Sequence, residues 1–396
     1  REKQSPLSRL ITIEMGKPLD QSQAEIEKCA LVCEYYAENG DNFLQDELIQ
    51  SDAKKSFISY DPIGPILAIM PWNFPFWQVF RFAAPNLIAG NTGLLKHSPN
   101  TTGWALKIQE IFLEAGFPEG AFTTILAQTD HVEAIISSDQ VAGVTLTGST
   151  KAGKSVAALS GKYLKKTVLE LGGSDPYVIL DDTDLTLAAD KCVTGRLINT
   201  GQSCIAAKRF IVTEKNADEF TEKVRMLMSQ KRFGDPLSGE YSLGTMARID
   251  LREQLHQQVT QSINAGAKCL LGGKNPDTTG YYYPATLLSH VSEGMPAFNK
   301  ELFGPVASII MAKDEHHAID IANDTAYGLG AAIFTQDTER AIYLSRGIEA
   351  GCVYINDFVK SDPRLPFGGV KSSGYGRELS PLGIKEFVNA KTIYVG

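Results

Sequence analysis

The sequence predicts an α/β protein with two parallel sheets and a separate small hairpin. From about residue 60, short apolar runs alternate with amphipathic stretches in the order strand, helix, strand, helix, strand. A second alternation of the same kind begins after residue 173. Apolar strands separated by amphipathic helices are typical of parallel sheets covered on both faces, with a ligand crevice at the carboxyl ends of the strands. The 396 residues, 43% of them hydrophobic, suffice for two or three domains.

The first alternation predicts a Rossmann-like cofactor-binding domain formed by residues 1–41 and 60–172. We expect strands in IGPILAIMP, TGLLKH, FTTIL and VAGVTLTGS. Helices are expected in FRFAAPNLIAG and TGWALKIQEIFLEAG, with a short one before the last strand. A nucleotide is the usual ligand of such a sheet.

The second alternation predicts a catalytic α/β domain over residues 173–365. We expect strands in PYVILDD and RFIVT and helices in LAADKCVTGRLINT and FTEKVRMLM. Outside both alternations, DELIQSDAKKSFISYDP predicts a hairpin around SDAKK, and the terminal KTIYVG is a short strand that needs a partner.

Composition excludes several classes of function. The net charge is -8 and the basic residues are scattered, so the sequence predicts no basic surface that would bind nucleic acid. No apolar run approaches the roughly 20 residues of a membrane span, and no signal peptide is visible, so we expect a cytoplasmic protein that binds no membrane. The six cysteines contain no CxxC pair and the histidines no HExxH, which indicates a reducing compartment and no metal site.

One glycine-containing loop has two interpretations. GSTKAGKS, residues 148–155, matches the GxxxxGKS pattern of a P-loop, and Asp181 with Asp182 ends an apolar strand as a magnesium ligand would. These features are compatible with an NTPase. The same loop is also compatible with a turn at a helix start, where exposed amides meet the pyrophosphate of a dinucleotide.

Seven stretches favour the second interpretation. They are PWNFP (71–75), LKHSP (95–99), LTGST (146–150), LELGGSDP (169–176), GQSC (201–204), ELFGP (301–305) and PFGGVKSSGYGRE (366–378). In this order, and over nearly the whole chain, they resemble the NAD(P)-dependent aldehyde dehydrogenases. An NTPase then becomes a remote alternative.

The resemblance implies the catalytic residues Cys204, Asn73 and Glu170. Cys204 would add to the aldehyde, because the tetrahedral adduct supplies the alkoxide that expels a hydride and leaves a thioester. The Asn73 side-chain amide and the Cys204 backbone amide would hold the oxyanion, and Glu170 would activate water for hydrolysis to a free acid. We expect the site to lower the thiol pKa or to remove its proton as substrate arrives.

The resemblance also implies an NAD or NADP site, without a Rossmann GxGxxG. The cofactor-binding residues that it predicts are Trp72, Lys96, Ser98, Gly148, Ser149, Leu171, Glu301 and Phe303. Pro99 stands where members that prefer NAD often carry a glutamate that repels a 2'-phosphate, so we expect NADP to be tolerated or preferred.

Substrate and assembly are also implied by the resemblance. RLINTGQSCIAAKRF and the region 354–379 look most like bacterial succinate-semialdehyde dehydrogenases, and Arg81 and Ser361 match the residues that hold the distal carboxylate. Some members have a second arginine at the position that Ile198 occupies here. The missing charge keeps a general aliphatic aldehyde dehydrogenase as the alternative. The sequence does not determine where the nearby Arg196 points. Residues 42–59 and 380–396 would form an oligomerisation arm of a homodimer or homotetramer, and residues 366–379 a return segment near the active site.

Overall fold

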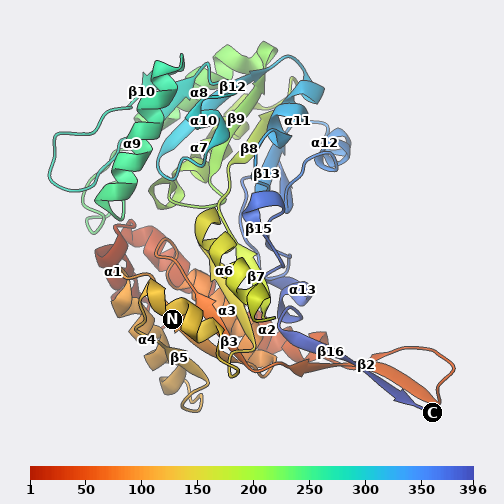
Figure 1. Ribbon diagram of the computed structural model, residues 1–396. Coiled ribbons are helices and arrows are strands. Elements are labelled where there is room, and N and C mark those ends of the chain that lie inside the picture. Colours follow the sequence, from red (N-terminus) through yellow and green to blue (C-terminus); the bar gives the residue numbers. More distant parts are fainter.

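The fold consists of two sheets covered by helices and a third, small sheet that projects from them (Figure 1). The computed structural model describes residues 1–396. Two of the sheets are mostly parallel and the third is small and antiparallel. The predicted α/β fold class is therefore confirmed.

The six-stranded sheet is built from the first alternation, with one strand added from the return segment. Its order is β15-β7-β6-β3-β4-β5, and every neighbouring pair is parallel except β15 with β7. The strands are β3 (Pro65–Ile69), β4 (Thr92–Lys96), β5 (Phe122–Thr124), β6 (Gly143–Thr147), β7 (Lys166–Glu170) and β15 (Gly374–Tyr375). The helices of this part are α1 (Gln4–Met15), α2 (Leu19–Phe43), α3 (Trp77–Ile88), α4 (Thr102–Glu114), α5 (Val132–Ile136) and α6 (Thr150–Lys162).

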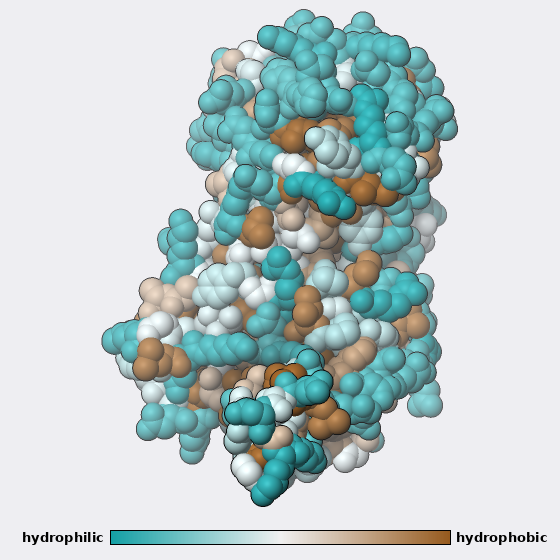
Figure 2. Space-filling model, turned by 90° about the vertical axis from the view of Figure 1, so that its right-hand side faces the viewer, coloured by the Kyte–Doolittle hydropathy of each residue, from teal (hydrophilic) through white to brown (hydrophobic).

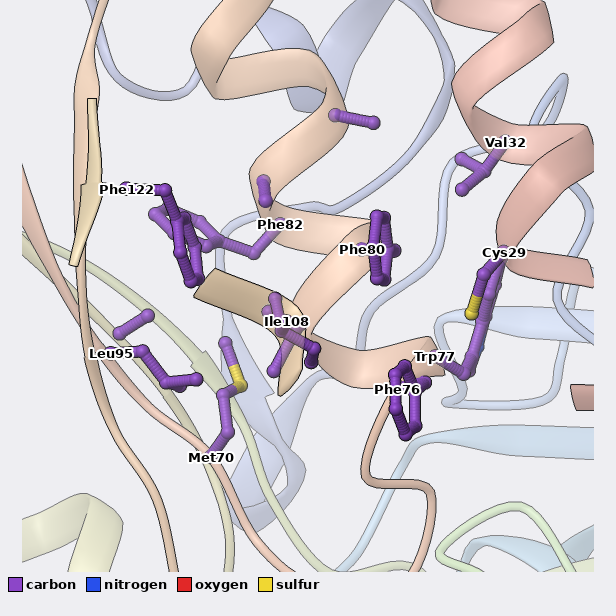
Figure 3. Packing of buried hydrophobic residues seen from close by; sticks show 14 of the residues in the cluster. Cys29, Val32, Met70, Phe76, Trp77, Phe80, Phe82, Leu95, Ile108 and Phe122 are labelled. Atoms are coloured by element: carbon purple, nitrogen blue, oxygen red, sulfur yellow. The ribbon is translucent and has the colours of Figure 1, made fainter. Parts of the chain in front are cut away.

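A large apolar core fastens the first helices to this sheet. Figure 3 shows side chains from α2, α3, α4 and the strands gathered in one cluster, including Cys29, Trp77 and Phe80. Burial of this apolar surface is the main force that holds α2 against α3. Cys29 is buried in this core.

The seven-stranded sheet follows from the second alternation and lies in the upper half of Figure 1. Its order is β10-β11-β12-β9-β8-β13-β14, and only β10 is antiparallel. The strands are β8 (Asp175–Ile179), β9 (Ala207–Thr213), β10 (Lys268–Leu271), β11 (Thr286–Ser289), β12 (Val306–Ala312), β13 (Gly330–Phe334) and β14 (Cys352–Ile355). The helices are α7 (Leu185–Leu197), α8 (Ala217–Ser229), α9 (Ile249–Asn264), α10 (Pro296–Asn299), α11 (Glu315–Asn323) and α12 (Thr338–Ser345).

A three-stranded arm projects from the lower half of the molecule (Figure 1). It consists of β1 (Glu47–Leu48), β2 (Lys55–Pro62) and β16 (Val388–Val395), which α13 (Ser380–Ile384) precedes. The predicted hairpin is the β1–β2 pair, and the terminal strand finds its partner in β2, from Val388 opposite Pro62 to Val395 opposite Lys55. Figure 2 looks along the arm, where apolar side chains stand among hydrophilic ones.

Short 3-10 turns complete the secondary structure. They are Thr129–His131, Ile198–Gly201, Glu214–Asn216 and Lys371–Ser373. None of the helices is both long enough and apolar enough to cross a bilayer.

Candidate active site

A cavity of about 420 Å³ brings together residues from both parallel-sheet parts of the chain. Eight of the predicted site residues line it: Trp72, Asn73, Gly148, Ser149, Leu171, Cys204, Glu301 and Phe303. Gly148 and Ser149 follow β6 and Leu171 follows β7, so this wall lies at the carboxyl ends of parallel strands. Ligands of open α/β sheets bind at that edge.

The loop before Cys204 has an unusual backbone. The sequence pattern predicts a helix through Thr200, but α7 ends at Leu197, and Asn199 and Thr200 each have a φ of 55°. Left-handed backbone at non-glycine residues is strained and persists only where its surroundings hold it. Here the Asn199 side-chain amide donates to the Asn73 carbonyl at 2.7 Å, and the Thr200 hydroxyl accepts the Gly244 N–H at 3.0 Å.

Arg196 holds the same loop in place and does not line the cavity. Its Nη2 donates to the carbonyls of Gly201 at 2.5 Å and Gly304 at 2.7 Å, and its side chain is fully buried. A Cβ at position 201 would lie 2.4 Å from the Gly304 carbonyl, and the φ of Gly201 is +74°, so this close approach requires glycine.

Two amide donors flank the thiol. The Asn73 Oδ1 accepts from Gln78 Nε2 at 3.1 Å, which orients the amide so that Nδ2 points toward the Cys204 loop, where it donates to the Gln202 carbonyl at 3.1 Å. The backbone N–H of Cys204 donates to no acceptor of the chain. Such donors could receive the oxygen of an adduct on the sulfur.

The thiol of Cys204 does not have the lowered pKa that we expected. Burial raises the pKa of Cys204 to about 12, and the positive charges of Arg81 and Lys208 offset this only in part. The remaining alternative, removal of the proton as substrate arrives, is therefore the one compatible with this structure.

Lys208 is a residue that the sequence reasoning missed. It lies in β9, donates from Nζ to the carbonyls of Ser203 at 2.9 Å and Cys204 at 2.7 Å, and lies 3.6 Å from the carboxylate of Glu301. Two basic residues inside a buried strand, Lys208 and Arg209, were the signal, because buried cations need partners.

Glu170 ends β7 and is almost fully buried. Neither of its carboxylate oxygens accepts a hydrogen bond from the chain. Burial and, after it, the negative charge of Glu378 raise the pKa of Glu170 to about 8, although the positive charges of Arg81 and Arg377 counteract both. A carboxylate of this kind can accept a proton near neutral pH.

Arg81 lies between these carboxylates. It forms an ion pair with Glu378, and its Nη2 reaches the Thr147 hydroxyl at 3.5 Å. Glu378 was also missed, although it ends the motif PFGGVKSSGYGRE, whose strand β15 pairs with β7 beside Glu170.

The far wall of the cavity suits a dinucleotide. Ser149 caps α6 by accepting the Ala152 N–H at 3.3 Å, so the helix begins with free amides that attract a phosphate. A Cβ at position 172 would lie 2.5 Å from a Glu301 carboxylate oxygen, which shows how closely the backbone and this side chain approach. Trp72 and Phe303 meet edge to face at 5.9 Å between ring centroids.

Two predicted cofactor residues lie outside this cavity. Lys96 donates from Nζ to the His97 carbonyl at 3.1 Å, and the Ser98 hydroxyl donates to Asn100 at 2.6 Å. Lys96 is the last residue of β4 and Ser98 follows it, two strands from β6 and beside a second hollow that His97 and Pro99 line. An adenosine end would lie there if the dinucleotide spans the sheet edge.

The P-loop interpretation is wrong. Lys154 lies inside α6 and is exposed, so the backbone around it bonds within the helix and cannot wrap a phosphate. Asp182 lies in the turn that follows β8, a strand of the other sheet, and accepts a hydrogen bond from the Thr335 hydroxyl. The two halves of the presumed NTPase site are thus in different sheets.

The predicted substrate residues lie apart from the cavity lining. The Ser361 hydroxyl accepts a hydrogen bond from Lys28 Nζ at 2.7 Å and is nearly buried. Ile198 is half-buried just after α7 and contributes no charge.

Comparison with known proteins agrees with this arrangement. The aldehyde dehydrogenase family profile matches residues 1–393. A Synechocystis protein described as a probable succinate-semialdehyde dehydrogenase [NADP(+)] is 51% identical over 98% of this chain and 85% of its own length. An Escherichia coli succinate semialdehyde dehydrogenase [NAD(P)+] is 48% identical over 100% of this chain and 85% of its own. The crystal structure of succinic semialdehyde dehydrogenase from Streptococcus pyogenes in complex with NADP+ covers 100% of this chain and 87% of its own, with a TM-score of 0.98 and 38% identity. This chain belongs to the aldehyde dehydrogenase family.

Proposed function

We propose that this protein oxidises succinate semialdehyde to succinate with NAD+ or NADP+. The observation that carries the proposal is the shared cavity, in which the Cys204 thiol, the Asn73 amide and the cap of α6 meet. The names of the relatives at 51% and 48% identity support the choice of substrate.

Cys204 and its neighbours perform the first half of the reaction. The thiol loses its proton and the sulfur bonds to the aldehyde carbon, whose oxygen becomes an alkoxide. The Asn73 Nδ2 and the Cys204 N–H donate to that oxygen. When bound, the nicotinamide ring supplies the hydride acceptor, and a thioester on Cys204 remains. Trp72, Glu301 and Phe303 line the wall that would hold this ring.

Glu170 performs the second half. It takes a proton from a water molecule whose oxygen attacks the thioester carbon, so that the acid leaves and the Cys204 sulfur is released. The raised pKa of about 8 suits this role, because a stronger base removes a water proton more readily.

Arg81 and Ser361 are the candidates for binding the distal carboxylate. The positive charge of Arg81 acts on the thiol and lowers the pKa of Cys204 against the effect of burial. Because Arg81 is paired with Glu378, less of its positive charge is available to attract a substrate carboxylate. Arg81→Ala would leave Glu378 buried without a partner, so Ser361→Ala is the milder test of the pocket.

A panel of two aldehydes with both cofactors tests the proposed function. Succinate semialdehyde should have a kcat/KM roughly ten- to a hundredfold above that of butanal, because a charge-assisted hydrogen bond to the carboxylate is gained. Reduced-cofactor absorbance gives the rates. Equal values for the two aldehydes would instead favour a general aliphatic aldehyde dehydrogenase, the alternative that the uncharged Ile198 supports.

Assembly and compartment complete the proposal. The arm exposes Leu48, Tyr394 and Val395, and the outer edges of its sheet are open to pairing, which supports a homodimer or homotetramer formed through the arm.

All six cysteines are free, which supports a reducing compartment such as the cytoplasm.

A further inference from the structure

Lys28 is a cation whose surroundings the catalytic chemistry does not explain. It lies on α2 and donates from Nζ to the Ser361 hydroxyl at 2.7 Å, across 333 positions of sequence. The same ammonium group lies 4.2 Å from the centroid of the Trp77 ring on α3. The Ser361 hydroxyl and the Trp77 ring hold the ammonium group of Lys28 in place, but neither neutralises its positive charge.

No carboxylate of the chain pairs with Lys28. None of the ion pairs within 4.0 Å includes it. The two carboxylates whose charges reach it have other partners: Glu25 pairs with Lys17, and Asp362 pairs with Arg364. Lys28 is half-buried, and a partly desolvated cation without a counter-ion is stabilised when an anion binds it.

Lys28 lies against the face of α3 that carries Arg81. Trp77 and Arg81 are four residues apart on α3, so they project from one face of that helix. Burial, followed by the positive charge of Arg81, lowers the pKa of Lys28 to about 8, which indicates that the two cations approach each other. Arg81 in turn acts on the Cys204 thiol. The charge of Arg81 therefore acts both on the thiol and on Lys28, which holds Ser361.

We propose that Lys28 binds the distal carboxylate of the aldehyde substrate, together with the hydroxyl of Ser361. The inference rests on the proposed function and deepens it, because it assigns the cation that decides specificity. Arg81 shares its charge with Glu378, whereas Lys28 retains its charge for a ligand. An aldehyde whose carbonyl lies at Cys204 and whose carboxylate lies two methylene groups away would present its charge on the Arg81 and Lys28 side.

Lys28→Met and Lys28→Arg test this assignment. Lys28→Met keeps most of the length of the side chain and removes the charge. The ratio of kcat/KM for succinate semialdehyde to that for butanal should fall roughly ten- to a hundredfold, mainly through a higher KM. Lys28→Arg should restore most of the ratio because it restores the charge.

Lys360→Met is the matched control. Lys360 precedes Ser361, is half exposed, and pairs with Asp357 at 2.6 Å, so its removal should leave the ratio unchanged. An inhibition assay adds a readout of binding alone: the inhibition constant of succinate should rise in Lys28→Met by a factor similar to the KM, and that of butyrate should not.

The outcomes separate this inference from the proposed function. If the wild-type protein does not prefer succinate semialdehyde, the proposed function fails. If the wild type prefers it and Lys28→Met keeps the same ratio and the same succinate inhibition, only the role of Lys28 is overturned. A loss shared equally by both aldehydes would also overturn it, since that indicates a structural role. Should Lys28→Met not fold, Lys28→Gln supplies the same comparison.

Discussion

Arg81 and Glu378 form an ion pair whose side chains are only 3% and 6% exposed. The pair connects α3 to the segment that follows β15, and it lies beside Glu170, whose pKa the charge of Glu378 raises. The site therefore holds two carboxylates and one guanidinium in a buried space. The protonation of Glu170 depends on that balance, because charges interact strongly where water is excluded.

Glu378→Gln should move the pH dependence of acyl-enzyme hydrolysis to lower pH. Glu170 must be deprotonated to act as a base, so the hydrolysis rate should rise with pH through about 8 in the wild type. Removing the negative charge of Glu378 lowers the pKa of Glu170 and also leaves Arg81 free to stabilise its anion. Single-turnover hydrolysis of the acyl-enzyme at several pH values measures the midpoint.

Glu349→Gln is the control for that experiment. Glu349 is exposed and pairs with Lys371 away from Glu170, so its removal should not move the midpoint. An unchanged or higher midpoint in Glu378→Gln would show that Glu378 does not set the basicity of Glu170.

The Cys204 thiol should alkylate slowly in the protein without substrate. Its pKa of about 12 leaves very little thiolate at pH 7, and the thiolate is the reactive form. The rate with iodoacetamide should increase roughly tenfold per pH unit between pH 7 and 9, in proportion to the thiolate fraction. Exposed Cys269 serves as the internal reference in peptide mass spectrometry. Faster alkylation of Cys204 than of Cys269 at pH 7 would contradict the raised pKa.

Pro99→Glu should shift cofactor preference toward NAD+. Pro99 lines the hollow beside Lys96, where a 2'-phosphate would lie if the dinucleotide follows the sheet edge. A carboxylate at this position would repel that phosphate, and we expect the ratio of kcat/KM for NADP+ to that for NAD+ to fall by roughly tenfold or more. Pro99→Gln has a similar volume without the charge and should change the ratio much less. Equal effects of the two substitutions would point to shape instead of charge.

The arm should mediate assembly. Light scattering at micromolar concentration should give the mass of a dimer or tetramer for the wild type, and Tyr394→Lys with Val395→Lys should reduce it, since both side chains are exposed on β16. Tyr343→Lys changes a tyrosine on α12 that is more exposed than Tyr394 and lies away from the arm, and it should not alter the mass. A monomeric wild type would refute the assembly that we propose.

The sequence by itself determined the order of the elements and the chemistry that they carry. Apolar runs such as PILAI and helix caps such as Ser149 depend on neighbouring residues, so local pattern was sufficient for them. The motif GQSC likewise identified the thiol that the structure places in the cavity. Local pattern failed at the end of α7, where Asn199 and Thr200 leave the helix because distant groups, including Gly244, bind them.

Only the tertiary structure decided which charges meet. The ion pair of Arg81 with Glu378 joins residues nearly 300 positions apart, and the contact of Lys28 with Ser361 joins residues 333 positions apart. The pKa of Cys204, which we expected to be lowered, is raised because burial outweighs its cationic neighbours. Desolvation and through-space charge depend on distances between segments that no sequence spacing specifies, and for that reason the electrostatics of this site could be determined only from the folded chain.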